Sequence, residues 1–142
     1  MPLKEIDYGT KEYEQMIELR YEVLRKPLGL DFSEAELTRS KSDILLGCFD
    51  DDEIQGCCML TDKGDGVAKL RQMAVRKRYQ GTGIGKELLL YAEAMARIKG
   101  FEKIIMHARA TAIGFYEKLG YQIVGDKFLE LGIEHYLMEK EL

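Results

Sequence analysis

The residues best suited to chemistry lie between Leu70 and Gly85, where an apolar run gives way to a basic segment and then to alternating glycines. These glycines lead directly into a pattern typical of a helix. The first N–H groups of a helix lack intrahelical partners, and the helix dipole adds about half a positive charge there, so such a loop attracts anions. Glycine also lets a phosphate approach without a clash with Cβ. The segment therefore predicts a phosphate-binding loop between a strand and a helix.

Two common phosphate-binding motifs do not fit this loop. A Walker loop reads G-x-x-x-x-G-K-[ST], whereas Lys86 is followed here by Glu87, and the dinucleotide motif G-x-G-x-x-G has a different glycine spacing. A domain that binds ATP or NAD is therefore disfavoured. The run Gln80-Gly81-Thr82-Gly83-Ile84-Gly85 instead resembles Q/R-x-x-G-x-G/A, the pyrophosphate-binding signature of the GNAT superfamily of N-acetyltransferases. Taken alone, this motif would also fit an ordinary glycine-rich turn.

A second segment resembles another block of the same superfamily, A-x-x-F/L-Y-x-K-x-G-F/Y. It matches at Ala112, Phe115, Tyr116, Lys118, Gly120 and Tyr121. Two such motifs in this order are more specific than either alone, and the resemblance extends over residues 43–139. The C-terminal segment from Glu130 to Met138, which contains G-I-x-H, resembles the E-x-G-I-P-H-x-x-M segment of a subgroup of uncharacterised bacterial relatives, with Glu134 in place of the proline. We therefore expect one N-acetyltransferase domain over residues 1–142, a length sufficient for one hydrophobic core.

The resemblance implies an α+β (mixed α/β) fold with a mixed, mostly antiparallel central sheet and helices on both faces. In that fold the fourth and fifth strands, here Ala68–Val75 and Lys103–Ala108, run parallel and then splay apart. Splayed strands leave backbone N–H and C=O groups unpaired, and the amides of the pantetheine arm of acetyl-CoA can satisfy them. The resemblance thus implies acetyl-CoA as co-substrate and no metal.

The resemblance also implies which residues hold acetyl-CoA. Backbone groups of Met73 and Val75 would pair with the pantetheine amides, and N–H groups from Gly81 to Lys86 would hold the pyrophosphate. Arg109 replaces the Asn that many relatives carry at this position, but its guanidinium also supplies donors. Arg76, Arg78 and Lys118 are candidates for the nucleotide phosphates, with a solvated surface charge as the alternative for each. The complete set is Met73, Ala74, Val75, Arg76, Arg78, Gln80, Gly81, Thr82, Gly83, Ile84, Gly85, Lys86, Arg109 and Lys118.

Tyr116 is the candidate catalytic residue, because the family's tyrosine at this position lies near the thioester sulfur and acts as general acid to the departing thiolate. A phenol with a pKa of about 10 is a weaker acid than a thiol with a pKa of about 8.5, so hydrogen bonding to the developing charge matters more than complete proton transfer. A merely packed tyrosine is the alternative. We expect Phe115 and Tyr121 to face the core.

The general base and the acceptor site are less well defined. Several relatives place a general-base Glu where this chain has Lys69, and no carboxylate lies between Ala68 and Val75. His107, Glu130, His135 or a chain of waters remain candidates for the base, and a structural role is the alternative for each histidine. Arg20 and Arg25 are candidates to bind a carboxylate of the substrate, with helix-surface charge as the alternative.

The elements that must position these residues alternate along the chain without a linker or repeat. Thr10 is suited to cap a helix that runs to about Arg25, and Pro27 ends it. Ser33 and Glu36 form a candidate capping box for a short second helix. The remaining expected elements are strands at 3–8, 44–49, 54–60, 68–75 and 103–108, a helix from residue 84 to Gly100, a short helix at 111–119 closed by Gly120, and two final strands.

Composition limits the classes of function. A net charge of −4 argues against nucleic-acid binding, and no apolar stretch approaches the ~20 residues that span a bilayer. The N-terminus lacks the apolar core of a signal peptide, so we expect a cytoplasmic protein that does not engage membranes. Cys48, Cys57 and Cys58 lack metal-ligand spacing and are expected to be buried free thiols, with the adjacent pair on opposite faces of a strand.

Two classes of function remain. The first is an acetyltransferase that moves an acetyl group from acetyl-CoA to a primary amine by direct attack within a ternary complex, where proximity supplies much of the rate. The second is a non-catalytic module that binds or senses acyl-CoA, an alternative that the missing base carboxylate and Arg109 keep open. Because members of this superfamily often dimerise, the resemblance allows a homodimer.

Overall fold

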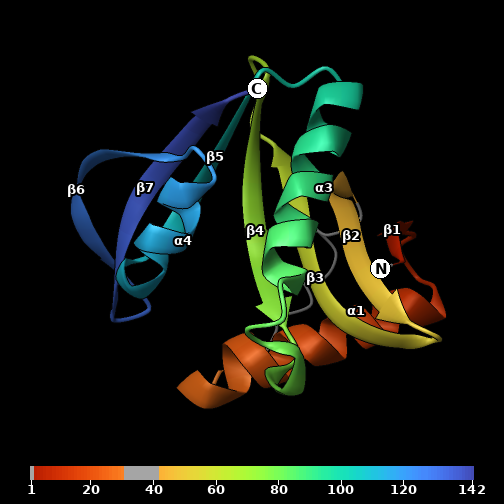
Figure 1. Ribbon diagram of the computed structural model, residues 1–142. Coiled ribbons are helices and arrows are strands. Elements are labelled where there is room, and N and C mark those ends of the chain that lie inside the picture. The colour runs from red at the N-terminus through yellow and green to blue at the C-terminus, as the bar shows by residue number, and fades with distance from the viewer. Residues whose placement is uncertain (1, 31–41) are drawn as a thin grey trace.

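The computed structural model describes residues 2–30 and 42–142, which form a seven-stranded sheet with helices on both faces (Figure 1). The strand order is β1-β2-β3-β4-β5-β7-β6. The strands are β1 (Leu3–Ile6), β2 (Ile44–Asp50), β3 (Glu53–Asp62), β4 (Val67–Val75), β5 (Lys103–Arg109), β6 (Gln122–Glu130) and β7 (Ile133–Glu141). The α-helices are α1 (Lys11–Arg20), α3 (Ile84–Ile98) and α4 (Ile113–Lys118). The strands and helices predicted for the described residues are present in the predicted order.

The sheet is antiparallel at every pairing except the one between β4 and β5, which is parallel. That pairing extends only from Val67 opposite Lys103 to Leu70 opposite Met106. Beyond it, β4 continues to Val75 and β5 to Arg109 without pairing to each other, and the two ribbons diverge in Figure 1. The predicted mixed sheet with splayed fourth and fifth strands is therefore confirmed.

A β-bulge in β4 lies where this divergence begins. Cys57 pairs with Ala74 and Met59 with Arg71, so two residues of β4 oppose one of β3. Within the bulge, Gln72 has a φ of +55°, a left-handed conformation that a side chain other than glycine adopts at some energetic cost. A bulge bends its strand and increases the local twist, which turns β4 away from β5. No sequence signal such as a glycine marks this bulge.

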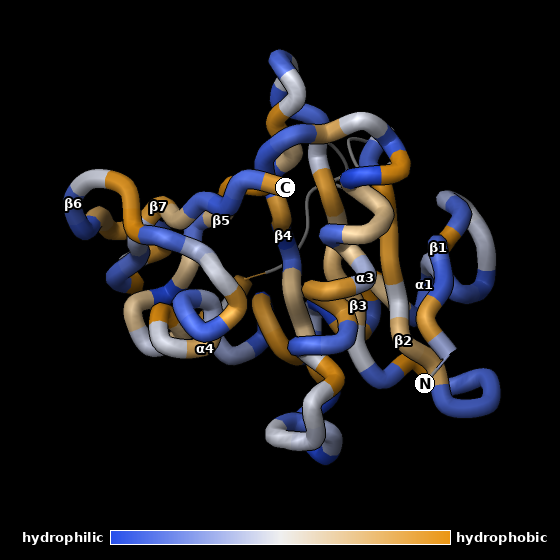
Figure 2. Tube along the Cα trace, turned by 45° about the horizontal axis from the view of Figure 1, so that its top comes forward, coloured by the Kyte–Doolittle hydropathy of each residue, from blue (hydrophilic) through white to orange (hydrophobic). Residues whose placement is uncertain are grey.

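The sheet has a hydrophobic core on each face. The core under α3 includes Leu88, Cys58 and Leu60, and the core under α1 includes Met16, Cys57 and Met59. Figure 2 shows hydrophobic residues along the central strands and hydrophilic ones in the turns. All three cysteines are free and buried, and the adjacent pair enters opposite cores, as predicted.

The first helix begins and ends as its sequence predicts. The Oγ1 of Thr10 accepts a hydrogen bond from the N–H of Tyr13 at 3.2 Å, and the helix continues through a π-helical turn to Arg25. A 3-10 turn containing Pro27 follows, and Gly29 ends it with a φ of +69°. The predicted capping box of Ser33 and Glu36 lies outside the described residues.

Across the residues that the structure describes, no helix is long and apolar enough to cross a membrane.

Candidate active site

A cleft of about 610 Å³ opens between β4 and β5 where the two strands diverge. Its walls come from residues 69–73 of β4, residues 106–109 of β5, and Ala112, Phe115 and Tyr116 at α4. The turn between β6 and β7 and the end of the first helix close the remaining sides. The cleft therefore lies at the parallel pairing of β4 with β5. Its walls include Ala112, Phe115 and Tyr116 of the second sequence motif, while the glycine-rich motif follows the end of β4 outside the cleft wall.

The cleft has two chemically different sides, because strand side chains alternate between faces. Ala68, Leu70 and Ala108 belong to the core under α3, together with Tyr116 of α4. The residues that alternate with these along β4 and β5 therefore lie on the opposite face of the sheet, the side of α1. They are Lys69, Arg71, His107 and Arg109. After the bulge the alternation of β4 is reversed: Ala74 packs in the core under α1, while Met73 and Val75 pack against the core under α3.

Tyr116 lines the cleft with 9% of its surface exposed. Its ring makes edge-to-face contacts with Phe115 at 5.0 Å and Tyr121 at 5.9 Å. Its hydroxyl forms no hydrogen bond to any residue that the structure describes. Burial raises the pKa of Tyr116 to about 12, and the nearby Cys58 thiol adds to the effect. The hydroxyl thus stays protonated at neutral pH and can donate a hydrogen bond to a group in the cleft.

The prediction that Phe115 faces the core is wrong, whereas Tyr121 is buried as predicted. Phe115 is 40% exposed and lines the cleft. The tip of the Phe115 ring lies near α3: a Cβ added to Gly85 would be 3.7 Å from the Cζ atom of Phe115. In a helix, successive side chains are turned by about 100°, so burial of Tyr116 leaves its neighbour at the rim of the cleft.

The glycine-rich loop exposes the N-terminus of α3, as predicted. Gly81 and Gly83 have φ values of +81° and +92°, and no side chain caps the helix. Glu87 is the first residue whose N–H bonds back into the turn, to the carbonyl of Gly83 at 3.1 Å. The N–H groups of residues 84–86 precede this bond and are available to an anion. A Cβ on Gly81 or Gly83 would meet no atom within 4 Å, so these positions need glycine for the backbone conformation rather than for space.

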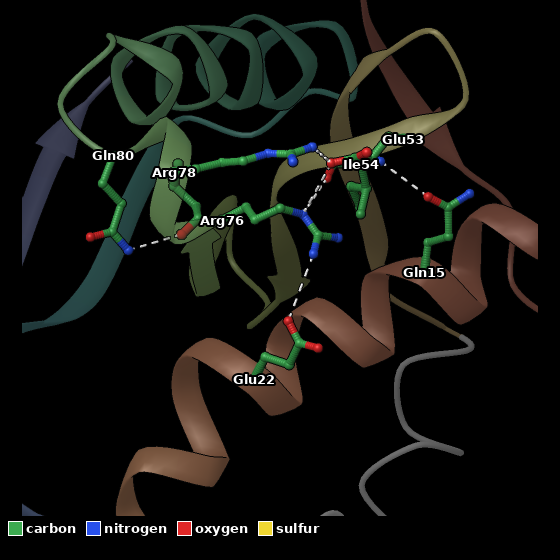
Figure 3. A network of polar contacts seen from close by, with 8 residues as sticks. Gln15, Glu22, Glu53, Ile54, Arg76, Arg78 and Gln80 are labelled. Atoms are coloured by element: carbon green, nitrogen blue, oxygen red, sulfur yellow. Dashed lines mark hydrogen bonds and ion pairs between the residues drawn. The ribbon is translucent and has the colours of Figure 1, made fainter.

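Gln80 shapes this loop by a contact visible in Figure 3, where its side-chain Nε2 donates to the carbonyl of Val75 at 3.0 Å. Thr82 adds a second brace, since its hydroxyl donates to the carbonyl of Tyr79. The first bond joins the loop to the end of β4, and the second lies within the loop. The two side chains therefore fix the course of the backbone that presents the N–H groups.

Arg76 and Arg78, two candidates for phosphate binding, have acidic partners in the structure (Figure 3). The Arg76 Nε donates to the carbonyl of Ile54 at 3.1 Å and lies 3.7 Å from Glu53, while its Nη1 lies 3.7 Å from Glu22. Arg78 also pairs with Glu53. Arg76 thus ties the loop to β3 and to the first helix, a role that the sequence analysis missed because its partners are distant in the chain.

The remaining candidates for CoA binding differ in position. Arg109 lines the cleft and is exposed. Lys118 is exposed at the end of α4 and is not part of the cleft wall. Met73 also lines the cleft, and the described residues place no strand beside the end of β4 on its β5 side. Backbone groups there are open to a ligand that pairs as an extra strand.

The three candidates for the general base lie together. The carboxylate of Glu130 is 3.4 Å from Nδ1 of His107 and 3.7 Å from Nε2 of His135. The Nδ1 of His135 donates to the carbonyl of Ile133 at 2.7 Å, so the neutral ring has its lone pair at Nε2, facing Glu130. All three residues line the cleft. The two histidines are far apart in sequence, and the pairing of β5 with β7 brings them together.

Of the two arginines considered for the acceptor, only Arg25 lines the cleft. Arg20 is 2% exposed, so the alternative of a surface charge is wrong for this residue. Burial lowers the pKa of its guanidinium. Arg20 follows Tyr13 and Met16 at helical spacing, and this periodicity is the signal that could have placed it on the buried stripe.

Comparisons with known proteins agree with this geometry. A family model described as "Acetyltransferase (GNAT) domain" matches residues 10–142. The uncharacterised protein YyaT of Bacillus subtilis is 41% identical over 76 residues, which are 54% of this chain and 51% of that protein. The chain spans about half the length of the curated relatives it matches.

Solved structures share the whole fold. A putative N-acetyltransferase from Lactobacillus plantarum has a TM-score of 0.88 at 25% identity, with 100% of this chain and 99% of that chain covered. An aminoglycoside 6'-N-acetyltransferase complexed with coenzyme A has a TM-score of 0.83 at 20% identity, with coverage of 99% and 97%.

Proposed function

The chain belongs to the GNAT acetyltransferase family, and we propose that it transfers an acetyl group from acetyl-CoA to a primary amine. The observation that carries the proposal is the cleft between β4 and β5, which places Tyr116 beside unpaired strand edges close to an uncapped, glycine-rich helix N-terminus. This arrangement suits a long ligand with a phosphate group at one end, amides along its length and a reactive thioester at the other.

Acetyl-CoA fits the donor groups in this order. Its pyrophosphate would accept hydrogen bonds from the free N–H groups at the start of α3, those of residues 84–86, and its pantetheine amides would pair with β4 from Met73 to Val75. The structural neighbour solved with coenzyme A shares the fold and supports this assignment. Arg78 would reach a phosphate only after its pair with Glu53 opens, so the backbone carries most of the proposed phosphate binding.

The proposed chemical step is direct attack of the neutral amine on the thioester carbonyl. The bond from carbon to sulfur breaks, and the electron pair leaves with the sulfur of CoA. Because the pKa of Tyr116 is about 12 and that of a free thiol is about 8.5, complete proton transfer from the phenol is uphill. Tyr116 would therefore stabilise the developing thiolate by hydrogen bonding, and the thiolate can take its proton later from solvent.

The amine must lose its own proton on the other side of the cleft. His107, Glu130 and His135 lie there as a contiguous group, and we assign the base function to this group. A histidine with a carboxylate partner is a common arrangement for accepting a proton near neutral pH. Lys69 stands where several relatives have a base carboxylate, so in this chain the carboxylate is supplied by β6 instead.

The test is the variant Tyr116→Phe, which removes the hydroxyl and keeps the ring. We expect kcat to fall at least about tenfold, the size of a typical hydrogen-bonding contribution to a transition state, with the dissociation constant of acetyl-CoA nearly unchanged. The measurement is thiol release across a panel of amines, with acetyl-CoA binding followed by calorimetry. Tyr91→Phe is the matched control, since it removes a hydroxyl from α3 away from the cleft.

The result also separates the two classes of function. Unchanged turnover in Tyr116→Phe would refute the catalytic assignment. Tight binding of acetyl-CoA by the unmodified protein without turnover of any amine would favour the non-catalytic binding or sensing module.

A further inference from the structure

The side of the cleft that faces the first helix carries an excess of positive charge. The described residues that line the cleft include four cationic side chains and one carboxylate. The cations are Arg25, Lys69, Arg71 and Arg109, and the carboxylate is that of Glu130. The chain as a whole has a net charge of −4, so this local excess runs against the overall balance. Such a concentration of one sign in a partly enclosed site selects ligands of the opposite sign.

Lys69, Arg71 and Arg25 lie away from the proposed site for the CoA phosphates. Lys69 and Arg71 alternate with Ala68 and Leu70, whose side chains enter the core under α3. They therefore project from the opposite face, toward the first helix, where Arg25 also lines the cleft. The glycine-rich loop follows the far end of β4, beyond the bulge. The positive side thus belongs to the part of the cleft that the second substrate enters.

Neither cation of β4 forms an ion pair within residues 2–30 and 42–142. Lys69 forms no ion pair with any residue that the structure describes, and burial, with Arg71 close by, lowers its pKa. The guanidinium of Arg71 contacts the neutral hydroxyl of Thr61 at 3.4 Å. The carboxylate of Glu130 lies 3.4 Å from Nδ1 of His107 and partly offsets the fall in the pKa of Lys69. It is one negative charge against several cations in this cleft. A half-buried cation without a contact ion pair is destabilising, and an anionic ligand that pairs with it would relieve this cost.

We propose that the amine acceptor also carries an anionic group, a carboxylate or a phosphonate-like group, which Lys69, Arg71 and Arg25 hold while the amine faces Glu130 and its histidines. This inference rests on the proposed acetyltransferase function and names its substrate class. The cleft of about 610 Å³ must also admit the acyl end of the donor, so the acceptor is a small molecule. Polycationic amines such as aminoglycosides would meet like charges and are disfavoured.

The experiment compares amines that differ only in charge. The probes are the common amino acids against their carboxamides, with 2-aminoethylphosphonate against β-alanine and β-alaninamide to distinguish a phosphonate from a carboxylate. Binding to the CoA-loaded protein is measured by calorimetry, and thiol release with acetyl-CoA is measured in parallel. Lys69→Gln and Arg71→Gln each remove one cation from β4. Lys26→Gln is the control, because it removes an exposed charge next to Arg25 that does not line the cleft.

We expect the acidic member of at least one set to bind at least about tenfold more tightly than its amide, as one charge-assisted hydrogen bond provides. Lys69→Gln and Arg71→Gln should reduce this preference, and Lys26→Gln should leave it intact. Equal binding within every set, or a preference for the amides, would overturn the inference. A preference for the anion without any thiol release would refute the proposed function, and with it the acceptor role, while still showing that Lys69 and Arg71 select an anionic ligand.

Discussion

Tyr116 keeps its proton over the whole physiological range, because burial raises its pKa to about 12. The same cause raises the pKa of the Cys57 thiol to about 12. Both groups are therefore neutral in the folded protein at pH values where the unfolded chain ionises. A site that must stabilise negative charge on sulfur benefits from a donor that does not itself ionise, and burial of Tyr116 provides one.

The raised pKa of Tyr116 makes the folded state sensitive to alkali. Below pH 10 the phenol is protonated in both states, but between about pH 10 and 12 the unfolded chain loses its proton first, so the free energy of unfolding falls. Two pKa units correspond to a loss of about 3 kcal/mol from this residue. The slope of the free energy of unfolding against pH reports how many more protons the folded state binds than the unfolded state. We expect Tyr116→Phe to lower this number by up to one between about pH 10 and 12, as measured by urea unfolding.

Phe115→Leu is the control for this slope, because it alters the neighbouring residue of α4 without removing a titrating group. A Tyr116→Phe protein whose slope between pH 10 and 12 equals that of the unmodified protein would contradict the expected pKa.

The residues that the sequence placed correctly are those fixed by local geometry. Gly81 and Gly83 adopt left-handed conformations that glycine favours, and Tyr116 lies in the cleft that its motif implies. Phe115 was placed wrongly because it lies at a rim that exists only where β4 and β5 diverge. Tertiary packing also brings Glu53 and Glu22 to Arg76, contacts that local sequence does not reveal.

At the scale of elements, a buried polar network holds the end of α4 against α3 and β7. The carboxylate of Glu93, 2% exposed, accepts a hydrogen bond from the hydroxyl of Tyr121 at 2.8 Å and pairs with the Nζ of Lys140 at 3.1 Å. The same Nζ donates to the carbonyl of Leu119 at 2.8 Å. Because Leu119 follows α4 directly, this network fixes the helix that carries Tyr116.

Glu93→Gln should destabilise the protein by about 2–4 kcal/mol, because it leaves the half-buried Lys140 ammonium without its counter-charge. The measurement is the free energy of unfolding in urea. Glu134→Gln, which breaks the exposed pair with Lys127, is the control and should have a much smaller effect. Equal losses in the two variants would show that the network does not anchor α4.

The order of the elements could be predicted because periodicity, caps and turns are local signals. The β-bulge at Gln72 could not, since nothing in the sequence there favours a left-handed residue, and the conformation is imposed by pairing with β3. The bulge matters for function because it exchanges the faces of β4, so that Lys69 and Arg71 face the first helix while Met73 and Val75 face α3. Local signals thus place the strand, and tertiary pairing decides what each side of the cleft presents.

At the scale of the whole molecule, the proposed function predicts that CoA stabilises the fold. A ligand at about 100 times its dissociation constant adds about 2.7 kcal/mol to the free energy of unfolding. For a domain of this size that corresponds to a rise in Tm on the order of 5 to 10 °C. We expect this rise with acetyl-CoA and with CoA in a thermal melt, and a much smaller one with ATP or NAD at the same concentration.

Helix α3 offers a matched pair of variants for this experiment. Gly83 begins the helix with a φ of +92° and Gly100 follows its end with a φ of +88°, and a Cβ at either would meet no atom within 4 Å. Alanine at either position therefore introduces similar backbone strain and lowers the Tm of the free protein by a similar amount. Only Gly83→Ala distorts the N–H groups proposed to hold the pyrophosphate, so it should reduce the rise in Tm with CoA, whereas Gly100→Ala should keep it. An equal rise in both variants would mean that the pyrophosphate binds elsewhere on the protein.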